Sequence, residues 1–140
     1  MEILTISKAA IQAGVGVETI RFYERKGLIR QPLKPQNSGY RNYPSDTVKT
    51  IRFIRQAQEL GFSLREIEEL LALKADPATD CADVRERAIE KLEEVERKIS
   101  QLYKMGSALK SVIASCPSRG GLDGCSIMEA LESSSSESER

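Results

Sequence analysis

The chain has 140 residues, enough for one domain of ordinary size or for a small domain with an extension. Aromatic residues make up 5% and charged residues 30%, a balance that suits a helical protein with exposed charged faces better than a large compact enzyme. The net charge is zero, but residues 1–60 hold ten Lys/Arg against five Asp/Glu, and the remainder holds eleven against sixteen. This asymmetry favours contact between the N-terminal part and a polyanion.

The compartment follows from what the sequence lacks. No apolar run is long enough for a membrane-spanning helix, and the N-terminus has no signal-peptide pattern. We therefore expect a cytoplasmic protein with no membrane partner. Disulfides are not expected in that reducing compartment, and the odd number of cysteines agrees with this.

The first thirty residues predict two short helices around a tight turn. Thr5 is a suitable N-cap, and small or apolar residues then recur at helical spacing up to Ala13. Gly14-Val15-Gly16 interrupts that pattern, and a second helix is expected over 17–26, with Gly27 just beyond its C-terminus. This arrangement is typical of a helix-turn-helix.

Residues 31–44 have a different character, with three prolines, one glycine and two tyrosines. Asn37-Ser38-Gly39 is a turn signal, and residues 40–43 alternate as a strand would. We predict a small hairpin, or wing, beside the helix pair.

Two further helices are expected before the globular part ends at Asp76-Pro77. The first carries apolar residues at helical spacing and closes at Gly61. The second begins with a capping box, in which Ser63 is the N-cap and Glu66 stands at the third helical position.

Residues 81–115 predict one long helix with a narrow apolar seam and charged residues between the seam positions. Such a seam, held for about four heptads, is typical of a coiled coil and implies a partner helix. The alternative is packing on the helix's own domain, but the rest of the chain offers little surface to cover some 45–50 Å of helix at about 1.5 Å per residue. The seam residues are Val84, Ala88, Leu92, Val95, Ile99, Leu102, Gly106, Leu109 and Ile113.

A glycine-rich loop and a short apolar segment follow, together covering residues 116–131. The last segment, 132–140, is rich in Ser and Glu, and we expect it to be disordered.

The three cysteines stand at the two ends of the long helix. Cys81 begins it, whereas Cys116 and Cys125 follow its end and flank the loop. Within one chain, Cys81 and Cys116 are separated by the whole helix and cannot hold the same ion. If two such helices pair antiparallel, Cys81 of one chain approaches Cys116 and Cys125 of the other, and two identical sites form. Parallel pairing would bring Cys81 to Cys81 instead.

Three thiolates without a histidine make a site for soft or borderline ions. A three-sulfur site suits Hg(II) best, followed by Cd(II), Pb(II) and Zn(II). Zinc would need a fourth ligand, such as water, Asp80, Asp83 or Asp123. The alternatives are three buried small side chains or a Cys116–Cys125 disulfide, but a glycine-rich loop is poorly suited to burying thiols.

The sequence also resembles the MerR family of bacterial regulators. The resemblance rests on IRFYERKGLI (20–29), GYRNY (39–43), IRFIRQAQELGFSLREIEELL (51–71) and the long helix, and it covers residues 3–131. It implies a mainly α fold: a winged helix-turn-helix DNA-binding domain (1–75), an antiparallel coiled-coil dimerisation helix (81–115) and a C-terminal metal-binding loop with a short helix (116–131).

The cysteine pattern is similar to that of the mercury-responsive members of this family, which implies Hg(II) at two sites per homodimer. Copper-sensing members are expected to have Ser in place of Cys81, and redox-sensing members need four cysteines for an iron–sulfur cluster. Zinc-sensing members usually have further Cys or His in the loop.

For DNA, the resemblance implies a dimer on a dyad-symmetric operator within a promoter used by RNA polymerase. It implies repression without metal and activation through DNA distortion with metal. The residues expected to contact DNA are Thr19, Arg21, Tyr23 and Lys26 from the second helix, and Tyr40 and Arg41 from the wing.

Two other classes of protein compete with a regulator. An enzyme such as a thiol reductase is disfavoured because the chain has no CxxC, no histidine and no nucleotide-binding glycine motif. A metal-binding dimer without regulatory function is the other, and it should bind DNA only weakly.

Overall fold

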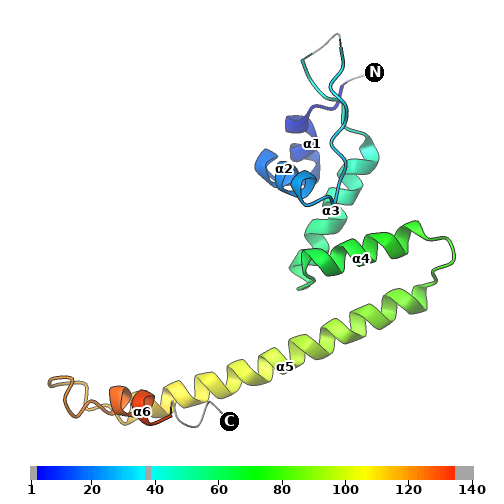
Figure 1. The fold of residues 1–140 in the computed structure, drawn as a ribbon. Helices are drawn as coiled ribbons and strands as arrows, with labels where there is room; N and C mark the ends of the chain where they lie inside the picture. The colour runs from blue at the N-terminus through cyan, green and yellow to red at the C-terminus, as the bar shows by residue number, and fades with distance from the viewer. Residues whose placement is uncertain (1–2, 37–38, 135–140) are drawn as a thin grey trace. The chain divides into compact units, whose positions relative to one another are not determined.

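The computed structural model of the protein describes residues 3–36 and 39–134, and over these residues it contains helices and no strand. The chain divides into two compact units, Met1–Lys91 and Leu92–Arg140. None of the described helices is long and apolar enough to cross a membrane. The helices, labelled in Figure 1, are α1 (Ile6–Ala13), α2 (Val17–Arg25), α3 (Ser45–Glu59), α4 (Leu64–Ala75), α5 (Cys81–Ala114) and α6 (Ser126–Ser134).

The helix-turn-helix pattern is confirmed by α1 and α2. The hydroxyl of Thr5 accepts a hydrogen bond from the Lys8 amide at 3.3 Å and so caps α1. Gly14 ends α1 in the left-handed region with φ 74°. Gly27 plays the same part after α2, with φ 77°, and the next amide, of Leu28, donates to the Tyr23 carbonyl at 3.0 Å.

The core of the first unit lies where α1, α2, α3 and α4 meet. Its fully buried large side chains are Ile20, Ile51, Ile54 and Ile67. Ala9, Ala10 and Ala13 present only methyl groups on the buried face of α1, which lets this helix lie close to α3. Each fully buried isoleucine contributes roughly 1.5–3 kcal/mol to folding.

The segment between α2 and α3 differs from the predicted hairpin. Residues 40–43 form no strand, and Figure 1 shows the segment as a loop reaching out beyond the helices. Pro32 and Pro35 lie in the part of the segment that would pair with residues 40–43 in a hairpin, and they lack the N–H that such pairing needs. Its base is tied to the N-terminal segment instead, by hydrogen bonds from the Tyr43 amide to the Leu4 carbonyl and from the Leu4 amide to the Asn42 side chain. The predicted turn at 37–39 lies mostly outside the described residues.

The predicted capping box at the start of α4 is confirmed. The Glu66 amide donates to the Ser63 hydroxyl at 3.2 Å, and the Ser63 amide donates to the Glu66 carboxylate at 2.8 Å. Two amides that the helix itself cannot satisfy are thereby paired.

The first unit extends past the predicted boundary at residue 75 and includes the first eleven residues of α5. Lys91, on α5, is 6% exposed, and its Nζ lies 2.8 Å from a carboxylate oxygen of Glu66. The same Nζ lies 5.4 Å from the centre of the Phe62 ring. Arg87 adds an ion pair with Glu69. The beginning of the predicted dimerisation helix is therefore packed on α4 within the first unit.

The second unit contains the rest of α5, a loop and α6. The loop bends through left-handed backbone at Ser118, Gly120 and Gly124, with φ values of 64°, 110° and 84°. The Ser115 and Ser126 hydroxyls lie 3.1 Å apart and join the two ends of the loop. The final turn of α6 includes residues 132–134, so the predicted disordered tail begins too early; residues 135–140 lie outside the described part.

Candidate functional site

The wing and α2 bring three of the predicted DNA-contacting residues to one place. Arg21 on α2 and Tyr40 and Arg41 in the wing all line a hollow of about 240 Å³. Arg21 is 54% exposed at its side chain and pairs with Glu18 at 3.1 Å, while Tyr40 is 67% exposed. The buried Nε atom of Arg41 has no hydrogen-bond partner among the described residues. The hollow therefore has two guanidinium groups in its lining, which suits an anionic group.

A buried tyrosine holds the wing against α2. The Tyr43 hydroxyl donates to the Glu24 carboxylate at 3.0 Å, and the ring is 3% exposed. Burial, followed by this hydrogen bond, raises the pKa of Tyr43 to about 12. Tyr43 thus remains neutral and keeps its donor at any ordinary pH, so the position of Arg41 relative to Arg21 does not vary with protonation of this residue.

Thr19 and Tyr23 line a second hollow, of about 450 Å³, on the other side of α2. Thr19 is half-buried, whereas Tyr23 is 2% exposed and belongs to the core. The Tyr23 hydroxyl donates to Gln58 at 2.7 Å, and burial raises its pKa. Tyr23 lies two helical positions after exposed Arg21, so its side chain points toward α3. Packing in the core therefore explains why a tyrosine stands at this position. Tyr23 is therefore a core residue and is not available at the surface for contact with DNA.

Lys26 follows α2 directly and is exposed. Its Nζ lies 5.6 Å from the centre of the Phe22 ring, an arrangement that keeps the ammonium at the surface.

Two arginines of α3 contribute contacts that sequence reasoning missed. Arg52 Nε donates to the Gln12 carbonyl at 3.1 Å, and Arg55 donates to the Gly14 carbonyl. They satisfy carbonyls at the end of α1 and place further positive charge beside the turn between α1 and α2. Arg55 also lines the hollow that holds Thr19. No sequence signal distinguishes these arginines from solvated ones, because their partners are backbone atoms some forty positions away.

The three cysteines have free thiols and lie at helix ends. Cys81 is the first residue of α5 and is exposed. Asp80, just before it, accepts hydrogen bonds from the amides of Ala82 and Asp83 at 2.8 and 3.4 Å and so caps the helix. The cap orders the backbone that carries Cys81 and leaves its side chain accessible.

Cys116 and Cys125 flank a single loop, and both are half-buried. Together they line a hollow of about 230 Å³ within that loop. The Ser118 amide donates a hydrogen bond to the Cys116 sulfur at 3.4 Å, which helps to fix this side chain within the loop. The Cys125 carbonyl accepts from the Glu129 amide at 3.0 Å, which places Cys125 at the N-terminus of α6.

Within one chain, no group of three or more Cys, Asp or Glu side chains gathers into a metal site among the described residues. Cys81 is the first of the 34 residues of α5, and at about 1.5 Å per residue this helix holds it far from the two loop cysteines. The donor set fits a soft ion, but a single chain supplies only the two loop cysteines to any one site.

Comparison with known proteins decides the family. Residues 4–74 match the family model described as "MerR HTH family regulatory protein", and residues 48–112 match "MerR, DNA binding". The chain is 43% identical over 132 residues to the mercuric resistance operon regulatory protein of Shigella flexneri, covering 94% of this chain and 90% of that protein. The chain belongs to the MerR family. Its relatives are transcription regulators and not enzymes.

Further relatives include a regulator whose name states no metal and two solved structures that contain different metals. The chain is 41% identical to the HTH-type transcriptional regulator CueR of Salmonella typhi, covering 91% of each protein. Among solved structures, PbrR691 of Ralstonia metallidurans CH34 in complex with lead(II) is 28% identical with a TM-score of 0.76, covering 90% of this chain and 97% of that one. MerR of Bacillus megaterium MB1 in complex with mercury(II) is 35% identical with a TM-score of 0.63, covering 88% and 94%. The protein is thus a metal-responsive regulator of this family.

Proposed function

We propose that this MerR-family protein is a mercury(II)-responsive regulator that acts as a homodimer on a dyad-symmetric promoter operator in the cytoplasm. The observation that carries the proposal is the placement of the cysteines, one at the start of α5 and two around the loop that follows its end. The nearly full-length similarity to mercuric resistance regulators supports the choice of ion.

The DNA surface consists of Thr19 and Arg21 on α2, Lys26 directly after α2, and Tyr40 and Arg41 in the wing. The residues on and directly after α2 would enter a major groove, while the wing would contact the flanking backbone. The position of Arg21 and Arg41 around one hollow supports this assignment, because guanidinium groups bind phosphate oxygens.

The metal site requires both subunits. Cys116 and Cys125 of one chain would hold the ion with Cys81 of the other, giving two sites per dimer. The three sulfurs would supply a soft, anionic ligand set that suits Hg(II). The half-buried loop hollow, lined by both of its cysteines, supports their joint use.

The switch is a change between two dimer conformations. A metal ion can shift that balance only by binding one conformation more tightly than the other. A site shared between subunits has this property, since it is complete only when the two chains are correctly aligned. Without Hg(II), the dimer would hold the promoter in a form that RNA polymerase uses poorly, and with Hg(II) it would distort the operator, at a cost of a few kcal/mol, into a usable form.

Replacing Cys81 tests the assignment. We expect Cys81→Ser to abolish Hg(II)-dependent transcription from the cognate promoter in a purified system, while operator affinity stays within about threefold of wild type. The matched control is Ala82→Ser, which places a hydroxyl in the same turn of α5 without removing a thiol. Loss of operator binding in Cys81→Ser would contradict the separation of metal and DNA roles.

A second candidate is a sensor of another divalent soft ion with the same mechanism, favoured by the lead(II)-bound relative. Titrating Hg(II) against Cd(II), Pb(II) and Zn(II) at fixed competing thiol separates the two. Highest affinity and strongest activation by Pb(II) would replace Hg(II) in the proposal. A metal-binding dimer without regulatory function would fail to shift operator DNA at physiological salt.

A further inference from the structure

The surroundings of Lys91 on α5 are unusual for a lysine. Among the residues of α5, all of which the structure describes, Lys91 is the buried one, and it is 6% exposed. Lysine is seldom buried, because removing its ammonium from water is costly unless a partner compensates. Lys91 is also the last residue of the first unit, on the same helix that begins with Cys81.

One carboxylate oxygen joins Lys91 to the beginning of α4. Oε1 of Glu66 accepts a hydrogen bond from Lys91 Nζ at 2.8 Å and another from the Ser63 amide, also at 2.8 Å. The Ser63 hydroxyl in turn accepts from the Glu66 amide at 3.2 Å. The oxygen that completes the capping box of α4 is therefore the same oxygen that binds α5, so a displacement of Lys91 acts directly on the first turn of α4.

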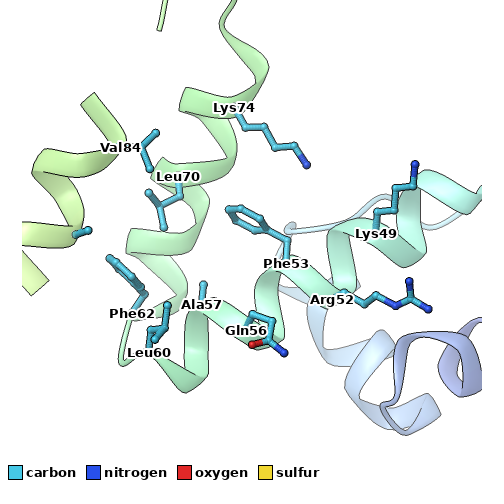
Figure 2. A pocket seen from close by; sticks show the side chains of 11 residues that line it. Lys49, Arg52, Phe53, Gln56, Ala57, Leu60, Phe62, Leu70, Lys74 and Val84 are labelled. Carbon is cyan, nitrogen blue, oxygen red and sulfur yellow. The ribbon is translucent and has the colours of Figure 1, made fainter. Parts of the chain in front are cut away.

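Apolar packing within the chain holds the start of α5 only loosely. A hollow of about 490 Å³ lies between α3, α4 and the start of α5, and Figure 2 shows Phe62, Leu70 and Val84 around it. Val84 is still 43% exposed. Apolar contacts are not directional, so they allow a helix to shift, whereas a charged hydrogen bond requires a short distance and a defined angle. Within the chain, Lys91 therefore defines the position of α5 on α4 more narrowly than the apolar contacts do.

The other ion pair between these two helices is more exposed. The side chains of Arg87 and Glu69 are 40% and 45% exposed, so solvent screens their attraction. The Lys91 side chain is 8% exposed, and its Nζ lies 5.4 Å from the centre of the Phe62 ring. A buried ion pair often adds no more stability than apolar side chains of similar size would. What the buried lysine adds here is a defined geometry between two helices.

Further contacts lead from the neighbours of Lys91 to α2. The Phe62 amide donates to the Ala57 carbonyl at 3.1 Å, which ties the turn before α4 to the end of α3. Gln58, the next residue of α3, accepts a hydrogen bond from the Tyr23 hydroxyl at 2.7 Å. Tyr23 lies on α2, the helix proposed to enter the major groove. The end of α3 thus connects the place where α5 is held with the helix that would contact DNA.

We propose that Lys91 is a positioning residue of the metal switch, an inference that rests on the proposed metal-responsive function. When Cys81 binds the ion, α5 changes its position, and Lys91 transmits that change through Glu66 to α4 and to the helices packed against it. Without this bond, α5 responds to metal while the DNA-binding helices keep their metal-free arrangement. Metal binding and operator binding then both persist, but the two are no longer coupled.

Lys91→Met tests the proposal, because methionine keeps a long apolar side chain and removes the ammonium. In the full-length protein, the fluorescence of a base analogue at the operator centre reports DNA distortion, and transcription is measured in parallel. We expect the Hg(II)-dependent change in both readouts to fall at least about fivefold, the lower end of typical coupling between two sites. The affinity for Hg(II) and the metal-free affinity for the operator should each stay within about threefold of wild type.

Glu66→Gln changes the other side of the same bond. Glutamine can keep the capping box, since its side-chain oxygen also accepts from the Ser63 amide, but a neutral acceptor holds the ammonium more weakly. We expect a smaller loss of the metal response in the same direction. The double variant should lose no more than Lys91→Met alone, because both substitutions act on one contact. Lys91→Arg keeps a charged donor and should retain most of the response.

The matched control is Lys98→Met, which removes an exposed lysine that pairs with Glu94 one heptad further along α5. This variant should respond to Hg(II) as the wild type does. Urea unfolding gives the temperature at which every variant is folded, and the readouts are compared there. A destabilised Lys91→Met that keeps the full response would show that Lys91 serves stability alone.

The wild-type measurement separates the two possible failures. If the operator bound to wild-type protein does not change with Hg(II), Cd(II), Pb(II) or Zn(II), the proposed function itself is overturned. If the wild type responds and Lys91→Met responds equally, only the positioning role is overturned. Additive losses in the double variant would show that Lys91 does not act through Glu66. Should Lys91→Met fail to fold, an undiminished response in Glu66→Gln would overturn the role by itself.

Discussion

Arg21 and Tyr23 lie two positions apart on α2, yet their side chains have opposite surroundings. Arg21 is exposed and borders the wing, while Tyr23 is inside the core with its hydroxyl bonded to Gln58. Two helical positions differ by about 200° around the axis, so one side chain can face DNA while the other faces α3. Aromatic and basic residues within a predicted recognition helix are therefore not equivalent evidence for DNA contact.

Tyr23→Phe tests this distinction. Removing the hydroxyl should lower the free energy of unfolding by about 1 kcal/mol, because Gln58 loses its donor, and should leave operator affinity within about threefold. Arg21→Ala, the exposed neighbour, should weaken operator binding by about tenfold and hardly change stability. Urea unfolding and gel shift at constant salt measure both. A large affinity loss in Tyr23→Phe with unchanged stability would return Tyr23 to the DNA surface.

At the scale of elements, a buried lysine joins α5 to α4 alongside the Arg87–Glu69 ion pair. Lys91 is buried and bonded to Glu66, whose carboxylate also completes the capping box of α4. The bond to Lys91, followed by that to the Ser63 amide, lowers the pKa of Glu66 to about 2. The aliphatic part of Lys91 lies against Gly61, 3.8 Å from the position that a Cβ would take there. A single lysine thus connects the helix that begins with Cys81 to the first turn of α4.

Lys91→Met should expose the contribution of this pair. Because the folded pKa of Glu66 is depressed below its ordinary 4.5, the pair stabilises the protein above about pH 4.5, and this stability is lost as the pH falls toward 2. Without the ammonium, the free energy of unfolding should fall by about 1–2 kcal/mol at pH 7, a modest loss since the Glu66 side chain is 38% exposed and solvent screens the pair. The dependence of stability on pH between 4.5 and 2 should become shallower.

Urea unfolding at fixed protein concentration over that pH range measures the effect. Lys98→Met is the control, because Lys98 lies one heptad further along α5 in an exposed pair with Glu94. An equal change in the free energy of unfolding in both variants would show that burial of Lys91 does not increase the contribution of its ion pair to stability.

For the whole molecule, the uneven charge distribution concerns association with DNA. The ten basic residues of the first sixty include those placed on α2, in the wing and on α3, while the acidic excess lies in the remainder. Phosphate contacts release counterions, so operator affinity should fall steeply as salt increases.

Arg41→Ala should reduce that salt dependence. If each wing of the dimer holds one phosphate through Arg41, the slope of log affinity against log salt should become shallower by about two. The weakening should be similar for the operator and for unrelated DNA, since a phosphate contact carries no sequence information. Gel shifts at several salt concentrations measure the slope, and Lys110→Ala, on the second unit, should not change it. Weakening confined to the operator would assign Arg41 to base recognition.

The sequence alone determined those features that depend on local order along the chain. The Thr5 cap, the Ser63–Glu66 capping box and Gly27 satisfy backbone groups within a few positions of themselves, so their residue types are sufficient to predict them. The heptad seam likewise depends only on spacing along one helix. The length of that helix gives the prediction that Cys81 and Cys116 cannot share an ion within one chain.

Only the tertiary structure decided what depends on contacts between distant segments. It buried Tyr23 against Gln58, used Arg52 and Arg55 to bond the end of α1, and placed Lys91 beside Glu66. The described residues of the wing also form no strand. A strand needs a neighbouring segment that donates backbone N–H groups, and Pro32 and Pro35 have none to donate. The physical reason is common to all of these: a lysine, arginine or tyrosine has the same intrinsic chemistry on the surface and in the interior, and its partner decides which of the two it occupies.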